Sequence, residues 1–145
     1  MSKIIKKIVV LFMVCCFFTC ALASCGSEGK AKSYIKDLFA AVAAGNYEKA
    51  ESFVHPMREL DAKKYFTGLE EQSGSKIDFQ KGVKIEKYIN IEHFDYIYEM
   101  DGHILDGELY IMKVRTRVSG MIVRFEIWVV DNVYGYGIYT LKTIK

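Results

Sequence analysis

The stretch that decides the fold runs from Glu108 to Val130 and has the sequence ELYIMKVRTRVSGMIVRFEIWVV. Apolar and charged residues alternate along both halves, and the Ser119-Gly120 pair between them is typical of a tight turn. If Val118 pairs with Met121 and pairing continues outward, a shift of one residue would mix the two sets. The alternation therefore predicts a β-hairpin with one buried face. The buried set is expected to comprise Tyr110, Met112, Val114, Thr116, Val118, Met121, Val123, Phe125, Ile127 and Val129.

The segments on either side extend this hairpin into a sheet. Isoleucine, valine and tyrosine dominate from Lys84 onward, with turn signals at Asp101-Gly102, Asp106-Gly107 and Asp131-Asn132. We expect four strands, at about 83–99, 108–118, 121–130 and 133–143. The facing of the first strand stays open.

A turn at Asp131-Asn132 fixes the facing of the last strand. Continuing the register across it places Tyr134, Tyr136 and Ile138 on the buried face. On the other face, Gly135 would lie opposite Trp128, and Gly137 opposite Glu126. We expect the large ring to cover a strand glycine, a known compensation in sheets.

Helical patterns fill the part of the chain before the strands. Residues 31–44 place Ile35, Leu38, Phe39 and Val42 on one apolar face. Gly45 suits the end of that helix, and Asn46 can cap a second one that runs to about residue 54, before Pro56. His55 is expected to meet the last carbonyls of this helix. A third helix is predicted over about 58–72.

Helices followed by an antiparallel meander predict an α+β domain with the helices on one face of a curved four-stranded sheet. This order resembles the cystatin-like, nuclear-transport-factor-2-like superfamily. The segment Ala44–Ala50, AGNYEKA, also resembles small envelope lipoproteins of that group. The resemblance implies a cystatin-like roll.

The first 24 residues have the pattern of an export signal. Lys3, Lys6 and Lys7 precede an apolar run over 8–23, which is shorter than the roughly 20 residues that a spanning helix needs. Leu22-Ala23-Ser24-Cys25 resembles the lipobox of bacterial lipoproteins. The resemblance implies cleavage before Cys25, a covalent diacylglycerol on its thiol, with or without a further N-acyl chain, and anchoring on the exported side of the cell membrane or outer membrane. An ordinary secretory leader or an uncleaved anchor are the alternatives.

The expected layout is a signal peptide (1–24), a lipidated Cys25 with a flexible tether (25–30) and one domain (31–145). Without the leader, 17 basic and 18 acidic side chains remain of the 20 and 18 in the whole chain. This balance excludes a protein that binds nucleic acid by bulk electrostatics. Since Cys15, Cys16 and Cys20 lie in the leader, the mature domain has no disulfide and no cysteine nucleophile.

The superfamily resemblance implies a conical pocket between helices and sheet, which some members use as isomerases or dehydratases with an Asp or His base. The predicted lining is nearly apolar and consists of Tyr34, Tyr134, Tyr136, Phe125 and Thr116. A base could come only from His93 or Asp95 on the first strand. We expect no catalytic residue and no cofactor besides the lipid. His93, Asp95, Asp101 and His103 have no spacing specific for a metal, so we expect no metal site.

The opposite sheet face carries a basic stripe, Lys113, Arg115, Arg117 and Arg124, together with Trp128. Arg115 and Arg124 would oppose each other directly, which is unfavourable unless an anion or acid lies between them. Trp and Arg are enriched at binding hot spots. The sequence therefore predicts a non-catalytic envelope lipoprotein that binds a protein partner or a small apolar ligand. The alternatives are a pocket enzyme and an immunity or exclusion factor acting through the stripe.

Overall fold

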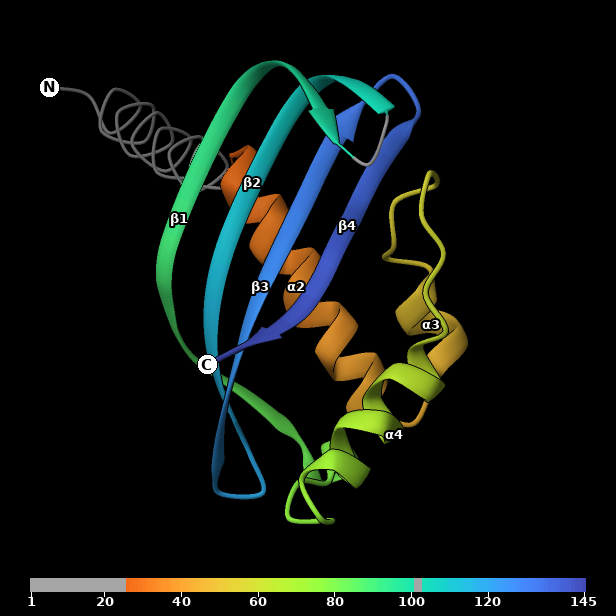
Figure 1. Cartoon of the computed structure of the whole chain (residues 1–145), viewed down its shortest axis with the longest axis vertical. Helices are drawn as coiled ribbons and strands as arrows, with labels where there is room; N and C mark the ends of the chain where they lie inside the picture. The colour runs from red at the N-terminus through yellow and green to blue at the C-terminus, as the bar shows by residue number, and fades with distance from the viewer. Residues whose placement is uncertain (1–25, 101–102) are drawn as a thin grey trace, which may run out of the picture. The chain divides into compact units, whose positions relative to one another are not determined.

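The computed structural model describes residues 26–100 and 103–145, and the fold below is that of the unit Ala31–Lys145. Within these ranges the helices are α2 (Ser27–Ala43), α3 (Tyr47–Glu51) and α4 (Ala62–Gln72), followed by the 3-10 turn η1 (Phe79–Lys81). The strands are β1 (Val83–Met100), β2 (His103–Val118), β3 (Met121–Asn132) and β4 (Gly135–Ile144). They form one antiparallel sheet in the order β1-β2-β3-β4, and α2 crosses one of its faces (Figure 1). The predicted α+β class and four-stranded meander are confirmed.

The β2–β3 hairpin has the predicted register, with Val118 paired to Met121 and Arg115 to Arg124. Ser119 and Gly120 have φ angles of 51° and 77°, as in the type I′ turn, whose twist matches that of the flanking strands. The predicted buried set is confirmed except for Met121, which lies beside the turn and is 45% exposed. The period of two in the sequence therefore determines this part of the sheet.

The outer ends of β1 and β2 are longer than predicted. Asp106 and Gly107 lie inside β2 rather than in a turn. Gly107 has a φ of 153°, and a Cβ built there would lie 2.0 Å from the carbonyl oxygen of Asp131 on β3. The glycine is therefore required by the close approach of two strands. The predicted turn at Asp101-Gly102 lies outside the described residues.

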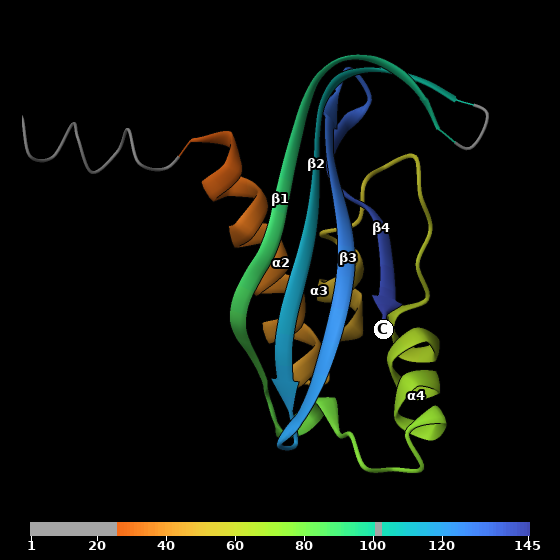
Figure 2. The same cartoon turned by 60° about the vertical axis from the view of Figure 1, so that its left-hand side comes forward.

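Two bulges bend β1. Its pairing with β2 passes from Ile85 to Lys87 and then from Tyr88 to Asn90, so Glu86 and Ile89 are extra residues. Bulges increase strand twist and break the alternation of facing. Both bulges lie in the first half of β1; the far ends of β1 and β2, beyond them, curve over in Figure 2. These bulges explain why the facing of the first strand could not be derived from its sequence.

The main core lies between α2 and the sheet face that carries Met112 and Phe125, which we call the inner face; the opposite face is the outer face. The predicted apolar stripe of α2 is buried there: Ile35, Leu38, Phe39 and Val42. The Phe39 ring lies 5.1 Å from the ring of Phe125, centroid to centroid. Phe66 of α4 lies 6.3 Å from Phe39 and closes the same core. The helices therefore cover the face that the hairpin pattern predicted to be buried.

The helix boundaries correct three expectations. α2 begins at Ser27, so the segment 27–30, predicted as a flexible tether, is helical. α3 ends at Glu51 rather than near residue 54, and α4 begins at Ala62 rather than near residue 58. The predicted cap is confirmed, since the Asn46 side chain accepts a hydrogen bond of 3.1 Å from the amide of Lys49. The chain between α3 and α4 is therefore longer than expected.

This connection lies along the free edge of β4. The amide of His55 donates to the carbonyl of Ile138 at 2.9 Å, and the amide of Ile138 donates to the carbonyl of Phe53 at 2.8 Å. Val54 and Ile138 form a parallel bridge. The segment 53–55 therefore acts as a short fifth strand that covers an edge which would otherwise present unpaired backbone groups.

The two strand glycines make room for this segment, and the predicted cover by the Trp128 ring is wrong. A Cβ at Gly137 would lie 2.6 Å from the amide nitrogen of His55, and one at Gly135 would lie 2.7 Å from Pro56 Cγ. The β3–β4 turn consists of residues 133–134 rather than 131–132. The change of turn, with a bulge after Trp128, pairs that residue with Thr140 instead of Gly135.

His55 was predicted to meet the last carbonyls of the second helix, but it is fully buried and its ring has other partners. Its Nδ1 accepts a hydrogen bond of 3.1 Å from the amide of Met57, so Nε2 carries the proton. Nε2 lies 3.0 Å from both Asn132 Oδ1 and the carbonyl oxygen of Gly135. The imidazole therefore ties the edge segment to the β3–β4 turn.

Candidate functional site: the outer face of the sheet

The residues predicted to line a pocket do not lie together. Phe125 and Thr116 are fully buried in the main core, and Thr116 Oγ1 donates to the carbonyl of Val123 at 2.9 Å. Tyr34 and Tyr136 contact each other edge to face, with ring centroids 4.6 Å apart. Tyr134 was predicted on the buried face but is 62% exposed, because it belongs to the β3–β4 turn. Packed side chains thus occupy the place where the lining was expected.

The described residues leave hollows on the surface instead. Hollows of about 130, 320 and 640 Å³ lie beside the segment 58–60, beside the C-terminal part of α2 and beside α4. None of these three is lined by the five residues predicted for the pocket. These three hollows therefore do not correspond to the predicted pocket.

The possible bases on β1 are both exposed. His93 stacks on Tyr110 with centroids 4.4 Å apart, and its Nε2 lies 3.5 Å from Glu108 Oε1. Its side chain is 41% exposed, and Asp95 is exposed too. A general base in a pocket enzyme is normally buried. Neither group has such surroundings.

The Tyr136 phenol, whose ring contacts that of Tyr34, has a shifted pKa. Burial raises its pKa, and the nearby Asp131 carboxylate adds to the effect. A raised pKa keeps the phenol protonated at neutral pH. The group can therefore donate a hydrogen bond but is a poor proton acceptor.

Among the side chains that the structure describes, no three His, Cys, Asp or Glu residues lie close enough together to hold a metal ion. His93 and Asp95 belong to that described part. The side chain of His103 and the whole of Asp101 lie outside the described residues.

The outer face near the β2–β3 turn gathers the predicted basic residues. The same side of the sheet carries Lys113, Arg115 and Arg117 of β2 and Arg124 of β3. Arg115 directly opposes Arg124, as predicted. We call Arg115, Arg117, Arg124 and the neighbouring Ile122 the basic patch. Ile122 is 41% exposed, so the patch combines positive charge with apolar surface.

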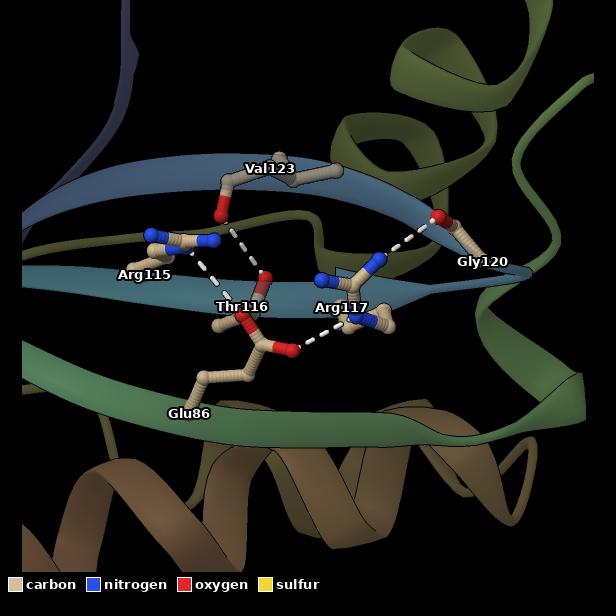
Figure 3. A network of polar contacts seen from close by, with 6 residues as sticks. All are labelled: Glu86, Arg115, Thr116, Arg117, Gly120 and Val123. Atoms are coloured by element: carbon tan, nitrogen blue, oxygen red, sulfur yellow. Dashed lines mark hydrogen bonds and ion pairs between the residues drawn. The ribbon is translucent and has the colours of Figure 1, made fainter.

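A carboxylate that the sequence analysis missed offsets part of this charge (Figure 3). Arg117 Nε donates to Glu86 Oε1 at 2.5 Å, and Arg115 Nε lies 3.1 Å from Glu86 Oε2, outside hydrogen-bonding direction. The hydrogen bond from Arg117 is the largest cause that lowers the pKa of Glu86. Glu86 is the bulged residue of β1, and a simple alternation cannot place a bulged residue.

Arg124 has no corresponding partner. Its side chain is exposed, and it makes no hydrogen bond or ion pair with any described residue. Arg115 across the ladder already faces Glu86. One carboxylate therefore serves two of the three arginines, and the third arginine remains available to an external anion.

Trp128 lies farther along the same face and is half-buried. Its Nε1 donates to Glu126 Oε1 at 2.9 Å, and Lys142 Nζ lies 2.8 Å from the same oxygen. The hydrogen bond from Lys142, followed by that from Trp128, lowers the pKa of Glu126. The Trp128 ring packs against a second small core on the outer face, formed by Leu109, Val130 and Tyr139. Trp128 therefore packs as part of the fold. Lys113 lies opposite Glu126, so an acid faces this cation across the ladder.

Comparison of the chain with models of protein families, with curated proteins and with solved structures finds no match. The predicted leader 1–24 and Cys25 lie outside the described residues. In the described part of the chain, every helix is too short or too polar to cross a bilayer.

Proposed function

We propose that this chain is a bacterial envelope lipoprotein that performs no catalysis and docks an anionic protein partner through the basic patch. The observation that carries the proposal is Arg124, an exposed arginine that opposes Arg115 and has no acid among the described residues. Directly opposed like charges cost stability in a sheet. An external carboxylate between the two guanidinium groups would remove that cost and add charge-assisted hydrogen bonds.

The filled core supports docking over a reaction in a pocket. Phe125, Thr116 and Phe39 occupy the volume between α2 and the sheet with almost no exposed surface. A cystatin-like roll, which the order of helices and strands supports, would in this chain serve as a rigid support for its outer face. Because the interior is closed, a partner has only the surface to bind.

The lipid anchor is proposed from the four residues ending at Cys25. Each buried methylene contributes about 0.8 kcal/mol, and a single acyl chain holds a protein only reversibly. A diacylglycerol thioether provides two chains at one site, with or without a third on the amino group. The anchor would hold the domain on the exported side of the cell membrane or outer membrane.

Binding of poly-L-glutamate, an acidic polypeptide, tests the proposed docking. Titration of the mature protein with this probe at low salt is expected to give binding that weakens as salt rises, since exposed charge pairs are screened. Arg124→Glu is expected to weaken binding at least tenfold, on the order of 1.4 kcal/mol. Lys36→Glu on α2 removes an equally exposed cation away from the sheet and is the matched control.

Equal losses in the two variants, or no binding by the parent protein, would contradict docking through this patch. Mass spectrometry of the protein isolated from bacterial membranes tests the anchor separately. A mature chain that begins at an acylated Cys25 is expected. A free thiol or a retained leader would remove the anchor from the proposal without affecting the docking result.

A further inference from the structure

Two pairs of exposed apolar residues lie at opposite ends of β3. Val133 and Tyr134 form the β3–β4 turn and are 83% and 62% exposed. Met121 and Ile122 follow the β2–β3 turn and are 45% and 41% exposed. A strand rises about 3.3 Å per residue, so β3 separates the two pairs by roughly 36 Å. The pairs are similar in chemistry and differ mainly in location.

The chain enters the domain at the end that carries Val133 and Tyr134. Tyr34 lies one helical turn after Ala31, and its ring contacts the ring of Tyr136, two residues after Tyr134. Cys25 lies only six positions before Ala31 in the sequence, with five residues between them. At its fullest extension such a segment spans about 22 Å. A lipid on Cys25 would therefore keep this end of the domain close to the bilayer.

The turn presents its side chains on a fixed backbone. Asn132 Oδ1 accepts a hydrogen bond of 3.0 Å from the amide of Tyr134. The buried His55 contacts both Asn132 Oδ1 and the carbonyl oxygen of Gly135, one on each side of the turn. The backbone is thus braced from inside the protein, while the Val133 and Tyr134 side chains face solvent. This arrangement suits insertion into a surface.

We propose that the Val133–Tyr134 turn inserts into the interface of the bilayer that holds the lipidated Cys25. This inference rests on the lipid anchor of the proposed function and is independent of the basic patch. Tyrosine is enriched at membrane–water interfaces, where its ring is buried and its hydroxyl stays hydrated. Asp131 and Glu108 form a cross-strand pair beside the turn, and Asp106 is exposed nearby. These acids favour a zwitterionic surface over an anionic one.

Site-specific labelling can test the insertion, because the sequence has no cysteine after Cys25. The mature lipidated protein carrying Tyr134→Cys or, as the matched control, Ile122→Cys is labelled with a small fluorophore. Each is reconstituted into phosphatidylcholine vesicles that contain a lipid with a nitroxide near its glycerol backbone. Quenching at position 134 is expected to exceed that at position 122 at least threefold. Adding phosphatidylglycerol to about a third of the lipid should reduce the difference.

Sedimentation of the same vesicles separates the two ways in which the idea can fail. If the protein sediments and positions 134 and 122 are quenched equally, the insertion is wrong and the anchor stands. If neither labelled protein sediments, the lipid anchor itself is wrong, and the insertion falls with it. A label that drives its own insertion would do so at position 122 as well, so the control also excludes that cause.

Discussion

The two faces of the sheet differ in what they contribute: the inner face is packed against helices, and the outer face carries exposed charge. On the inner face Met112, Phe125 and Ile127 are fully buried against helices, so this face stabilises the fold through packing. On the outer face a glutamate shared by two arginines lies in partial solvent, and Arg124 has no acid beside it. Exposed ion pairs contribute little to stability. Packing on the inner face therefore accounts for more of the stability than charge on the outer face, which leaves that charge free for the proposed docking.

The largest effect is expected from a cavity in the inner face. Phe125→Ala should lower the free energy of unfolding by about 3–5 kcal/mol, because it removes a fully buried ring that contacts Phe39. Urea denaturation measures the change. Ile122→Ala on the outer face, at a residue that is 41% exposed, should cost less than about 1 kcal/mol. Similar costs at the two positions would remove the distinction between the faces.

A smaller effect is expected where the edge segment lies on β4. Gly137→Ala places a methyl group 2.6 Å from the His55 amide nitrogen and should cost about 1–3 kcal/mol. Gly68→Ala is the control, since a Cβ there meets nothing within 4 Å inside α4. Alanine is favoured over glycine in a helix by about 1 kcal/mol, so this change should stabilise the protein. Melting temperatures that shifted in the same direction for both variants would contradict the close packing of Gly137 against His55.

The dependence of stability on pH tests the contribution of Glu86 on the outer face. The pKa of Glu86 is lower in the folded protein than its ordinary value of 4.5, so its stabilising contribution is present above pH 4.5. It is lost as the pH falls through the lower, folded value. Glu86→Gln should therefore lose less stability than the parent protein as the pH falls below 4.5. Glu71→Gln, at an exposed carboxylate that forms no ion pair with described residues, is the matched control for the loss of one acid. Parallel curves for the parent and Glu86→Gln in acid denaturation would exclude the role given to Glu86.

The smallest effect is expected at Arg124 itself. Arg124→Thr removes the charge opposite Arg115 and should raise the free energy of unfolding by a few tenths of a kcal/mol. Arg115→Thr instead leaves Glu86 with one arginine and should not stabilise the protein. Urea midpoints measured at low salt, where charge repulsion is least screened, compare the two. Stabilisation by Arg115→Thr alone would mean that Arg124 is the better compensated of the pair.

Local patterns predicted much of this molecule because the forces that act on them are local. The stripe of α2, the cap at Asn46 and the β2–β3 register each depend on residues within one or two turns of chain or one ladder. The β3–β4 turn lies two residues later than predicted, because Asn132 Oδ1 accepts a hydrogen bond from the amide of Tyr134 and so stabilises a turn at 133–134. Tyr134 therefore lies on the surface and not in the predicted pocket.

The candidate site was predicted only in part. The basic stripe and the opposition of Arg115 and Arg124 follow from the alternation in the hairpin. Glu86 was missed because a bulge shifts the facing of β1, and Trp128 proved half-buried because a second small core forms beneath it. Each miss involves contacts between segments far apart in the sequence.

The sequence alone determined the hairpin from Glu108 to Val130, since a pleated strand exposes alternate residues to opposite sides and only one register separates apolar from charged ones. The contact of segment 53–56 with β4, for which Gly135 and Gly137 make room, became visible only in the folded chain. The tertiary structure also decided that large side chains fill the space beneath the sheet. Such outcomes depend on how distant surfaces fit together, and no periodicity along the chain encodes that fit.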